Sequence, residues 1–143
     1  MDEIDLKLIE ILRKNGRLPN AEIARNLKVS EGTIRRRLKY LFEKKLMQIV
    51  GIPNFNKIGF STTAIIGLRT TPSQTEKIAS KLRDMEEIWT CYITTGAFDI
   101  FIYIAVESSQ QLGELLRNKI GTIPGVKRTE TFVEISNQDS TIV

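Results

Sequence analysis

The sequence predicts an α+β protein in which a helical N-terminal third precedes a longer region of mixed strands and helices. Apolar residues recur at helical spacing through about the first 45 residues, whereas later segments alternate between strand-like and helical patterns. The charge divides at nearly the same place. Residues 1–50 carry 12 Lys+Arg against 7 Asp+Glu, and residues 51–143 carry the other 9 against 10. A chain of 143 residues suffices for one large domain or two small ones.

The composition excludes several classes of protein. With 41% hydrophobic and 27% charged residues the chain is of the ordinary globular type, and no apolar run approaches the roughly 20 residues of a membrane-spanning helix. The acidic start Met1-Asp2-Glu3 does not resemble a signal peptide. Cys91 is the only cysteine and there is no histidine, which removes histidine-dependent catalysis and histidine or paired-cysteine metal sites. We expect a cytoplasmic protein with no catalytic residue, cofactor, metal or membrane partner.

Two short helices are predicted at the N-terminus. Asp2 is expected to cap the first, with Asp5 three residues later, and Asn15-Gly16 is a stop signal. The second is expected over residues 20–27, before the turn Lys28-Val29. The buried positions are predicted at helical spacing: Ile4, Leu8, Ile11 and Leu12 in the first helix, and Ala21, Ala24 and Leu27 in the second.

A third helix is predicted to begin after Ser30, a strong N-cap, and to end near Lys44. Joined to the second helix by a tight turn, it completes a helix-turn-helix, in which the last helix enters the DNA major groove. Residues 46–52 are apolar and β-branched and predict a strand. The buried stripe of the third helix is expected at Ile34, Leu38, Leu41 and Phe42.

The outer face of this third helix is basic. An arginine can bind guanine through two hydrogen bonds, or bind phosphate. Arg36 is the best candidate for a base contact and Arg35 and Arg37 for phosphate contacts, although the sequence does not separate these roles. A lone arginine triplet is more often a solvated surface, but its position on the basic third of the chain favours double-stranded DNA as the partner. The candidate DNA-binding residues are Ser30, Gly32, Thr33, Arg35, Arg36, Arg37, Lys39 and Tyr40.

The rest of the chain predicts the order βαββαβ, a ferredoxin-like antiparallel sheet with two helices on one face. We divide the chain into a helix-turn-helix domain at 1–50, a linker at 51–60 and the ferredoxin-like domain at 61–143. Ser73 with Glu76, and Ser108 with Gln111, are the expected helix-capping pairs. The expected elements are Thr62–Arg69, Ser73–Met85, Ile88–Thr95, Asp99–Val106, Ser108–Ile120 and Val126–Ser136, with a hairpin turn at Gly96-Ala97-Phe98.

The strand at 99–106 is apolar on both faces. Its even positions are all Ile or Val, and its odd positions include Phe101, Tyr103 and Ala105. An antiparallel sheet with helices on one side normally alternates, because its other face meets water. The chain offers no residues for a further layer, so a second copy is expected to cover this face, and the alternative is an exposed aromatic patch on a monomer.

Several segments, in order and spacing, resemble the Lrp/AsnC (feast/famine) family of transcriptional regulators over nearly the whole chain. In the first domain Asn15-Gly16-Arg17 resembles the first turn of the family. In the second, Thr95-Gly96-Ala97-Phe98-Asp99 resembles its Gly-x-x-Asp hairpin. The other matching segments are Asp2-Glu3-Ile4-Asp5 with Leu8, Glu22-Ile23-Ala24 with Leu27, Val29 and Ser30, Ile34 with Arg37, Leu38 and Leu41, Ile123-Pro124-Gly125-Val126, and Arg128-Thr129-Glu130-Thr131.

The resemblance implies a sequence-specific DNA-binding regulator that dimerises through its sheets, often as an octamer or another multiple of dimers. Many members of the family sense an amino acid near the Gly-x-x-Asp hairpin. Backbone donors near Gly96 could hold a carboxylate and Asp99 could pair with an ammonium group, although both residue types also shape hairpins. Carried over by position, the candidate effector-binding residues are Gly96, Ala97, Phe98, Asp99, Thr129 and Thr131.

Two positions depart from the family pattern. Glu43-Lys44-Lys45-Leu46 stands where a glycine usually follows the recognition helix, and a non-glycine residue in the left-handed conformation costs roughly 1–2 kcal/mol. The helix end, and with it the placement of any wing, is therefore uncertain from sequence. Pro19 stands where a capping Ser, Thr or Asp is usual, which the start of a helix tolerates.

Two other functions remain open on the sequence alone. Similar two-domain folds occur in sirohaem decarboxylases, but those enzymes rely on histidine and arginine at the substrate, and this chain has no histidine. An architectural DNA-binding protein with weak sequence preference also fits, because outward arginines contact phosphate as well as bases.

Overall fold

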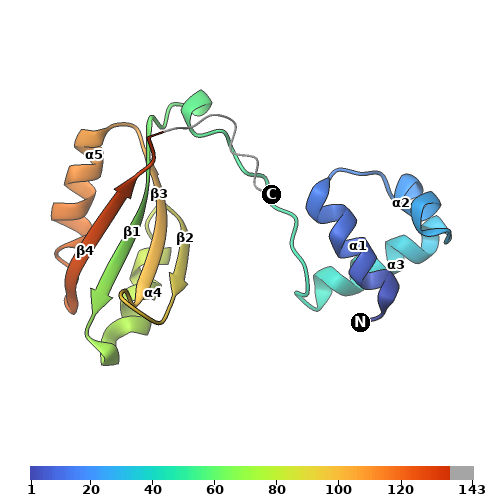
Figure 1. The fold of residues 1–143 in the computed structure, drawn as a ribbon, viewed down its shortest axis with the longest axis horizontal. Helices are drawn as coiled ribbons and strands as arrows, with labels where there is room; N and C mark the ends of the chain where they lie inside the picture. The colour runs from blue at the N-terminus through green and yellow to red at the C-terminus, as the bar shows by residue number, and fades with distance from the viewer. Residues whose placement is uncertain (136–143) are drawn as a thin grey trace. The chain divides into compact units, whose positions relative to one another are not determined.

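The computed structural model describes residues 1–135 and divides them into two compact units, one comprising Met1–Ile52 and the other beginning at Pro53 (Figure 1). The first unit holds α1 (Glu3–Lys14), α2 (Asn20–Leu27) and α3 (Glu31–Glu43). These are the three helices that the periodicity predicts. In the described part of the chain no helix is both long and apolar enough to cross a bilayer.

The start of α1 confirms the predicted cap. The Asp2 carboxylate accepts from the backbone N–H of Ile4 and Asp5, and the Asp5 carboxylate accepts from the Asp2 N–H at 3.0 Å, which completes a capping box. The helix ends at Asn15, as expected. Pro19, before α2, makes no side-chain capping bond.

The core of the first unit differs from the predicted stripes at three residues. Ala21 is exposed, and Ile23, which the sequence prediction omitted, is fully buried with Ala24. Phe42 is 40% exposed, so Leu41 forms the inward end of the α3 stripe. On the short helix α2 the apolar face was placed out of phase, whereas on α3 the predicted stripe is correct as far as Leu41 and extends one residue too far. The buried residues are Leu8, Leu12, Ile23, Ala24, Ile34 and Leu41.

A lysine in the left-handed conformation follows both α2 and α3. Lys28 and Lys45 each have a φ of 54°. At the end of α3 the Leu46 N–H donates to the Leu41 carbonyl at 2.9 Å and the Lys45 N–H donates to the Phe42 carbonyl at 3.0 Å. Carbonyls that a helix end leaves free are thereby satisfied. The helix therefore ends without the usual glycine, at a cost of roughly 1–2 kcal/mol.

The strand predicted over residues 46–52 is wrong. Residues 47–54 have no regular secondary structure, and Leu46, Ile49, Val50 and Ile52 are exposed. A strand requires a neighbour for its backbone groups, and the described chain places none beside this segment. The segment therefore forms no wing, and the first unit is a plain helix-turn-helix.

The second unit is the predicted ferredoxin-like fold. Its sheet consists of β1 (Thr62–Thr70), β2 (Ile88–Ile93), β3 (Ile100–Val106) and β4 (Val126–Val133), all antiparallel in the order β2-β3-β1-β4. The helices are α4 (Thr75–Arg83) and α5 (Ser109–Glu114), the latter continued by the π-helical η3 (Leu115–Ile120). Ser136, the predicted end of the last strand, lies outside the described residues.

Both helices pack on one face of the sheet (Figure 1). The alternate residues of β1 and β3 that point to this face are buried, because successive side chains of a strand point to opposite faces of the sheet. The core contains Ala64, Ile66, Leu68, Ile100, Ile102, Ile104 and Val106 from these strands, and Ile78, Ala79, Leu82, Leu112, Leu115 and Ile120 from the helices.

One predicted helix cap is confirmed in part and the other is wrong. The Ser108 hydroxyl accepts from the Gln111 N–H at 3.2 Å, but the Gln111 side chain accepts from the Glu107 N–H and not from Ser108. Ser73 does not cap α4, because Pro72–Gln74 forms a 3-10 turn that precedes the helix. A proline at the start of that turn already has the required φ, which moves the helix start to Thr75.

Candidate nucleic-acid interface and effector hairpin

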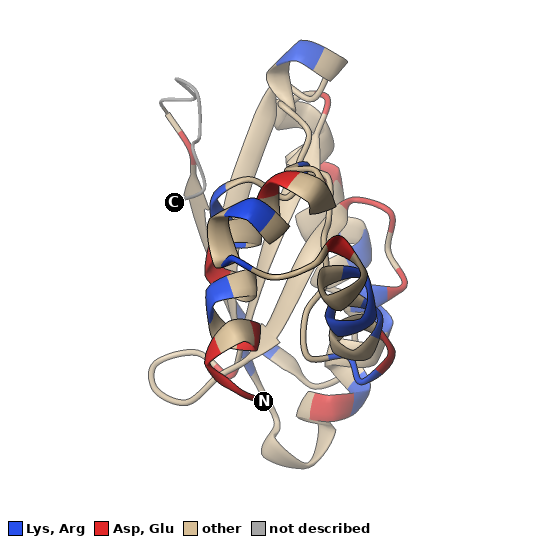
Figure 2. Cartoon of the chain, turned by 90° about the vertical axis from the view of Figure 1, so that its right-hand side faces the viewer, with Lys and Arg blue, Asp and Glu red and all other residues tan. Residues whose placement is uncertain are grey.

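The outer face of α3 presents basic and aromatic side chains to solvent. Arg36, Lys39 and Tyr40 are all exposed, and Figure 2 marks the Lys and Arg positions of the chain in blue. Within residues 1–135, Arg36 forms no ion pair. Its guanidinium therefore keeps all five of its donors free for an external acceptor.

The other basic residues on this face are held only by exposed ion pairs. Arg35 pairs with Glu31 at 2.9 Å and Lys39 with Glu43 at 3.8 Å, each four residues apart on the helix. Exposed pairs of this kind contribute only about 0–1 kcal/mol, so a phosphate can displace the carboxylate at little cost. Arg35 and Lys39 are therefore available to a polyanion.

Arg37 behaves differently from its two neighbours. Its guanidinium donates to the Asp2 carboxylate at 2.7 Å and to the Asp5 carboxylate at 2.8 Å, and the side chain is only 22% exposed. The Asp5 side chain is 6% exposed. Arg37, which the sequence assigns to a phosphate, is thus turned toward α1 and joins α3 to the first turn of that helix.

The electrostatics of this contact follow from its hydrogen bonds. The backbone N–H of Asp2 and then the Arg37 guanidinium lower the pKa of Asp5. The pKa of Asp2 is lowered in the same way, by the Asp5 N–H first and by Arg37 second. The sequence carries a signal for this contact, because Asp5 lies three residues before Leu8 on the buried stripe of α1, where a charge requires a partner.

The N-terminal end of α3 contributes hydroxyl groups. Ser30 accepts from the Thr33 N–H at 3.2 Å, and the two hydroxyls lie 2.8 Å apart. Gly32 beside them is exposed and has open space around it. Further along the helix, Arg36, Arg37 and Tyr40 line a shallow hollow of about 440 Å³ with residues 1, 2 and 5 at the N-terminus of the chain. The eight predicted DNA-binding residues therefore divide into seven at the helix start or on its outer side and one, Arg37, engaged internally.

The hairpin between β2 and β3 is fixed by Asp99. Its carboxylate accepts from the Thr70 N–H at 2.7 Å, and its own N–H donates to the Leu68 carbonyl at 2.9 Å. These bonds lie where the pairing of β1 with β4 shifts register after Arg69. Gly96, at the exposed tip, has a φ of 118°, which favours glycine. The Asp99 carboxylate is therefore part of the sheet structure.

The six candidate effector residues do not converge in one chain. Phe98 lies over Gly67, where an added Cβ would approach the ring to 2.7 Å. Thr129 and Thr131 pair with Leu68 and Ile66 and share their helix-facing side, which is the opposite face of the sheet. Gly96 and Ala97 are exposed at the hairpin tip. A single chain thus holds these residues at one end of the sheet but on both of its faces.

The face of the sheet opposite the two helices, which we call the open face, is covered only in part. Phe98 covers one end, and Phe55, which is 7% exposed, packs against Trp89 and Tyr103 with ring centroids 4.7 and 5.8 Å away. The expectation that the chain offers no residues for this face is therefore wrong, because a segment predicted as linker folds onto it. The large apolar residues that stay exposed there are Ile65, Trp89, Tyr92 and Phe132.

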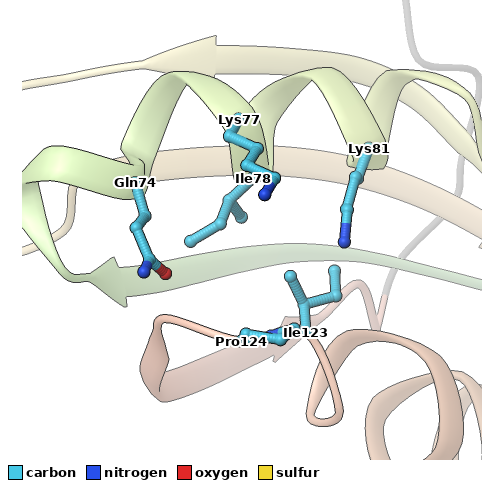
Figure 3. Close-up of a pocket in the computed structure, with 6 residues that line it drawn as sticks. All are labelled: Gln74, Lys77, Ile78, Lys81, Ile123 and Pro124. Atoms are coloured by element: carbon cyan, nitrogen blue, oxygen red, sulfur yellow. The ribbon is translucent and has the colours of Figure 1, made fainter.

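A small groove between α4 and the turn before β4 is shown in Figure 3. Its volume is about 60 Å³ and its lining includes Lys77, Lys81 and Gln74. Ligand pockets are typically about 300–1,000 Å³, so this groove is too small for an amino acid. The Gln74 amide oxygen lies where a Cβ on Gly125 would be, at 2.0 Å, which explains the glycine at that position.

A helix-turn-helix with a basic outer face, joined to a ferredoxin-like domain, defines a two-domain DNA-binding protein. Residues 1–41 match the AsnC-type helix-turn-helix domain and residues 63–141 match the Lrp/AsnC ligand binding domain. The chain belongs to the Lrp/AsnC family of helix-turn-helix transcriptional regulators, as its segments at both ends predict.

Relatives agree with this assignment. The HTH-type transcriptional regulator Ptr1 of Methanocaldococcus jannaschii is 40% identical over 123 residues, which cover 84% of this chain and 82% of that protein. The structure of AsnC from E. coli superposes with a TM-score of 0.78 at 27% identity and covers 95% of this chain and 93% of that one. The regulator NMB0573 from Neisseria meningitidis, solved in complex with L-Met, has a TM-score of 0.82 at 21% identity and covers 95% and 90%, which shows a shared fold. Two named relatives of 36–40% identity are HTH-type transcriptional regulators, which indicates a transcriptional regulator.

Proposed function

We propose that this protein reads a specific double-stranded DNA sequence by inserting α3 into the major groove. The observation that carries the proposal is Arg36, exposed at the centre of the outer face and without an ion pair in the described chain. Tyr40 lies one helical turn after Arg36 on the same face. Arg35 and Lys39 lie on either side, and each forms an exposed ion pair with a glutamate that a DNA phosphate can displace. At the helix start, Ser30, Gly32 and Thr33 complete the proposed interface. Such an arrangement can combine contacts to the base edges with contacts to the phosphates of the DNA backbone.

The test is fluorescence anisotropy of DNA binding across a salt series, with the upstream region of the protein's own gene compared with a scrambled duplex. A preference of about a thousandfold with a steep dependence on salt is expected for a sequence-reading regulator. Equal, salt-sensitive binding to both duplexes would favour the architectural alternative. No binding to either duplex at low salt would exclude DNA binding through α3.

We further propose that a second copy covers the open face of the sheet and that the resulting dimers associate into an octamer or another multiple of dimers. Support comes from Ile65 and Phe132, which are paired neighbours on β1 and β4 and are both exposed. Tyr92 on β2, 62% exposed, extends the patch to the other edge. Patches of adjacent large apolar residues are uncommon on monomers, and a sheet face is self-complementary under two-fold symmetry. Light scattering coupled to size exclusion measures the assembly.

The effector of this regulator is proposed to be a free amino acid bound at the hairpin tip. Gly96 and Ala97 are exposed, so their backbone groups can face a neighbouring subunit, and the related fold from Neisseria meningitidis was solved with L-Met. The other four candidate residues lie at the same end of the sheet, on one face or the other: Phe98, Asp99, Thr129 and Thr131. Calorimetric titration with each of the twenty amino acids tests the proposal, and heat from none of them would contradict it. A bound amino acid acts by favouring one assembly state over another.

A further inference from the structure

Two contacts leave only a short free segment between the two units. On the N-terminal side, Ile49 packs against the first unit, because its Cγ2 lies 3.2 Å from the position of a Cβ on Gly16. On the C-terminal side, Phe55 is buried against the sheet. Residues 50–54, which we call the tether, connect these two points. Val50 and Ile52 within it are exposed.

The Phe55 side chain is held on three sides by aromatic rings. Its centroid lies 4.7 Å from Trp89, 5.8 Å from Tyr103 and 6.2 Å from Phe60, and the Trp89 and Phe60 rings meet it edge to face. Edge-to-face pairs are favourable beyond the area that they bury. The cluster therefore fastens the segment before β1 to the open side of the sheet.

The turn that carries Phe55 is closed by its own hydrogen bonds. The Asn54 side chain accepts from the Lys57 N–H at 3.2 Å, and the Phe55 carbonyl accepts from the Phe60 N–H at 3.0 Å. Gly59 permits this closure with a φ of 100°. Residues 54–60 thus form a compact turn, and the tether ends where the turn begins.

We propose that Phe55 is a specificity-determining anchor: by docking on Trp89 and Tyr103 it keeps the tether short and so limits the spacing between DNA half-sites that paired recognition helices can reach. With the anchor docked, the chain from residue 49 to residue 55 spans at most about 20 Å. With the anchor released, the free chain extends to the start of β1 and spans up to about 45 Å. Each recognition helix has its own tether, so release adds up to about 25 Å of reach to each helix, which is a large fraction of the roughly 34–36 Å of one DNA turn.

The effect on half-site spacing rests on the proposed function, whereas the docking of Phe55 on the sheet does not. Lengthening a flexible tether lowers the effective concentration of the second reading unit roughly as the −3/2 power of its length. Release of the anchor should therefore cost about fourfold in affinity at the preferred spacing. Release should also reduce the loss of DNA affinity at other half-site spacings, because the longer tether allows the recognition helices to reach them.

The first experiment needs no DNA. Phe55→Ala is compared with Ile52→Ala, which removes a similar apolar side chain from the tether without touching the cluster. Trypsin cleavage after Lys57 should accelerate at least tenfold in Phe55→Ala, relative to cleavage after Lys45, because the turn opens. Emission from Trp89, the only tryptophan, should shift to the red. Ile52→Ala should match the wild type, and an unchanged cleavage rate and emission in Phe55→Ala would overturn the anchor.

The second experiment measures DNA affinity over duplexes whose half-sites are moved apart one base pair at a time. The wild type should show a sharp optimum and Phe55→Ala a flatter profile. Insertion of seven Gly/Ser residues after Gly51, with Phe55 intact, should flatten the profile equally, and it covers the case in which Phe55→Ala fails to fold. A sharp profile in the insertion variant would overturn the spacing role. Absence of specific binding by the wild type would instead contradict the proposed function and leave the protease result to decide on the anchor.

Discussion

Helix α3 and the hairpin between β2 and β3 use their polar groups in opposite ways. On α3 the side chain at the centre of the outer face, Arg36, has no ion-pair partner in the described chain. At the hairpin the candidate ligand group, the Asp99 carboxylate, already accepts from the Thr70 N–H at 2.7 Å. On α3 the basic side chains are free to bind an external anion within a single chain. At the hairpin the Asp99 carboxylate is already hydrogen-bonded to the backbone of β1. The comparison teaches that a residue suited by type to bind a ligand can already be engaged in the fold.

The largest effect is expected at the open face of the sheet. Ile65→Asp places a carboxylate in the patch that a second copy is proposed to cover, and burying an unpaired charge costs several kcal/mol. The variant should be monomeric by light scattering at concentrations where the wild type is assembled. Leu6→Asp, which changes an exposed residue of α1, serves as the control and should assemble normally. A fully assembled Ile65→Asp protein would show that another surface holds the subunits together.

Arg36→Ala tests whether the outer face of α3 contributes to DNA binding and not to stability. It should weaken specific DNA binding by about 1–3 kcal/mol and relax base preference, with the melting temperature nearly unchanged because the side chain has no internal partner. Arg83→Ala, which removes the same charge from the exposed end of α4, is the matched control. Anisotropy against the specific and scrambled duplexes provides the measurement. Unchanged affinity and preference in Arg36→Ala would remove it from the interface.

Asp99→Ala tests the same contrast at the hairpin. Removing the carboxylate leaves the partly buried Thr70 N–H without its acceptor, and an unpaired buried group costs about 1–3 kcal/mol. Denaturant unfolding should therefore show lower stability in the absence of any ligand, unlike Arg36→Ala. Glu86→Ala, at an exposed carboxylate beyond α4, should have no such effect. Wild-type stability in Asp99→Ala would mean that the carboxylate is available to a ligand.

The smallest effect is a change in the response to acid. The folded-state pKa values of Asp2 and Asp5 lie below their ordinary values, so the folded state binds fewer protons than the unfolded state. Their contribution to stability is present above about pH 4–5 and is lost as the pH falls through the folded-state pKa. Asp5→Asn should therefore unfold at lower denaturant concentration at pH 7 and show a shallower loss of stability below pH 4. Equal acid sensitivity in both proteins would contradict the role of this contact.

Local rules account for the features that were predicted correctly. Asp2 at the start of α1 and Ser30 at the start of α3 each satisfy backbone donors within three residues, so the chain nearby contains all the required information. The outer face of α3 was predictable because helical geometry alone places Arg36 and Tyr40 on one side.

The sequence by itself therefore determined the three helices of the first domain, the βαββαβ order of the second, the caps of α1 and α3, and the basic outer face of α3. Tertiary structure alone decided three other features: the strand expected at 46–52 did not form, Arg37 joined Asp5 of α1, and Phe55 docked on Trp89. Each depends on a partner that is absent or lies more than 30 residues away in the chain. Such contacts form only when the packing of other elements brings the two groups together, and periodicity and capping rules contain no information about that packing.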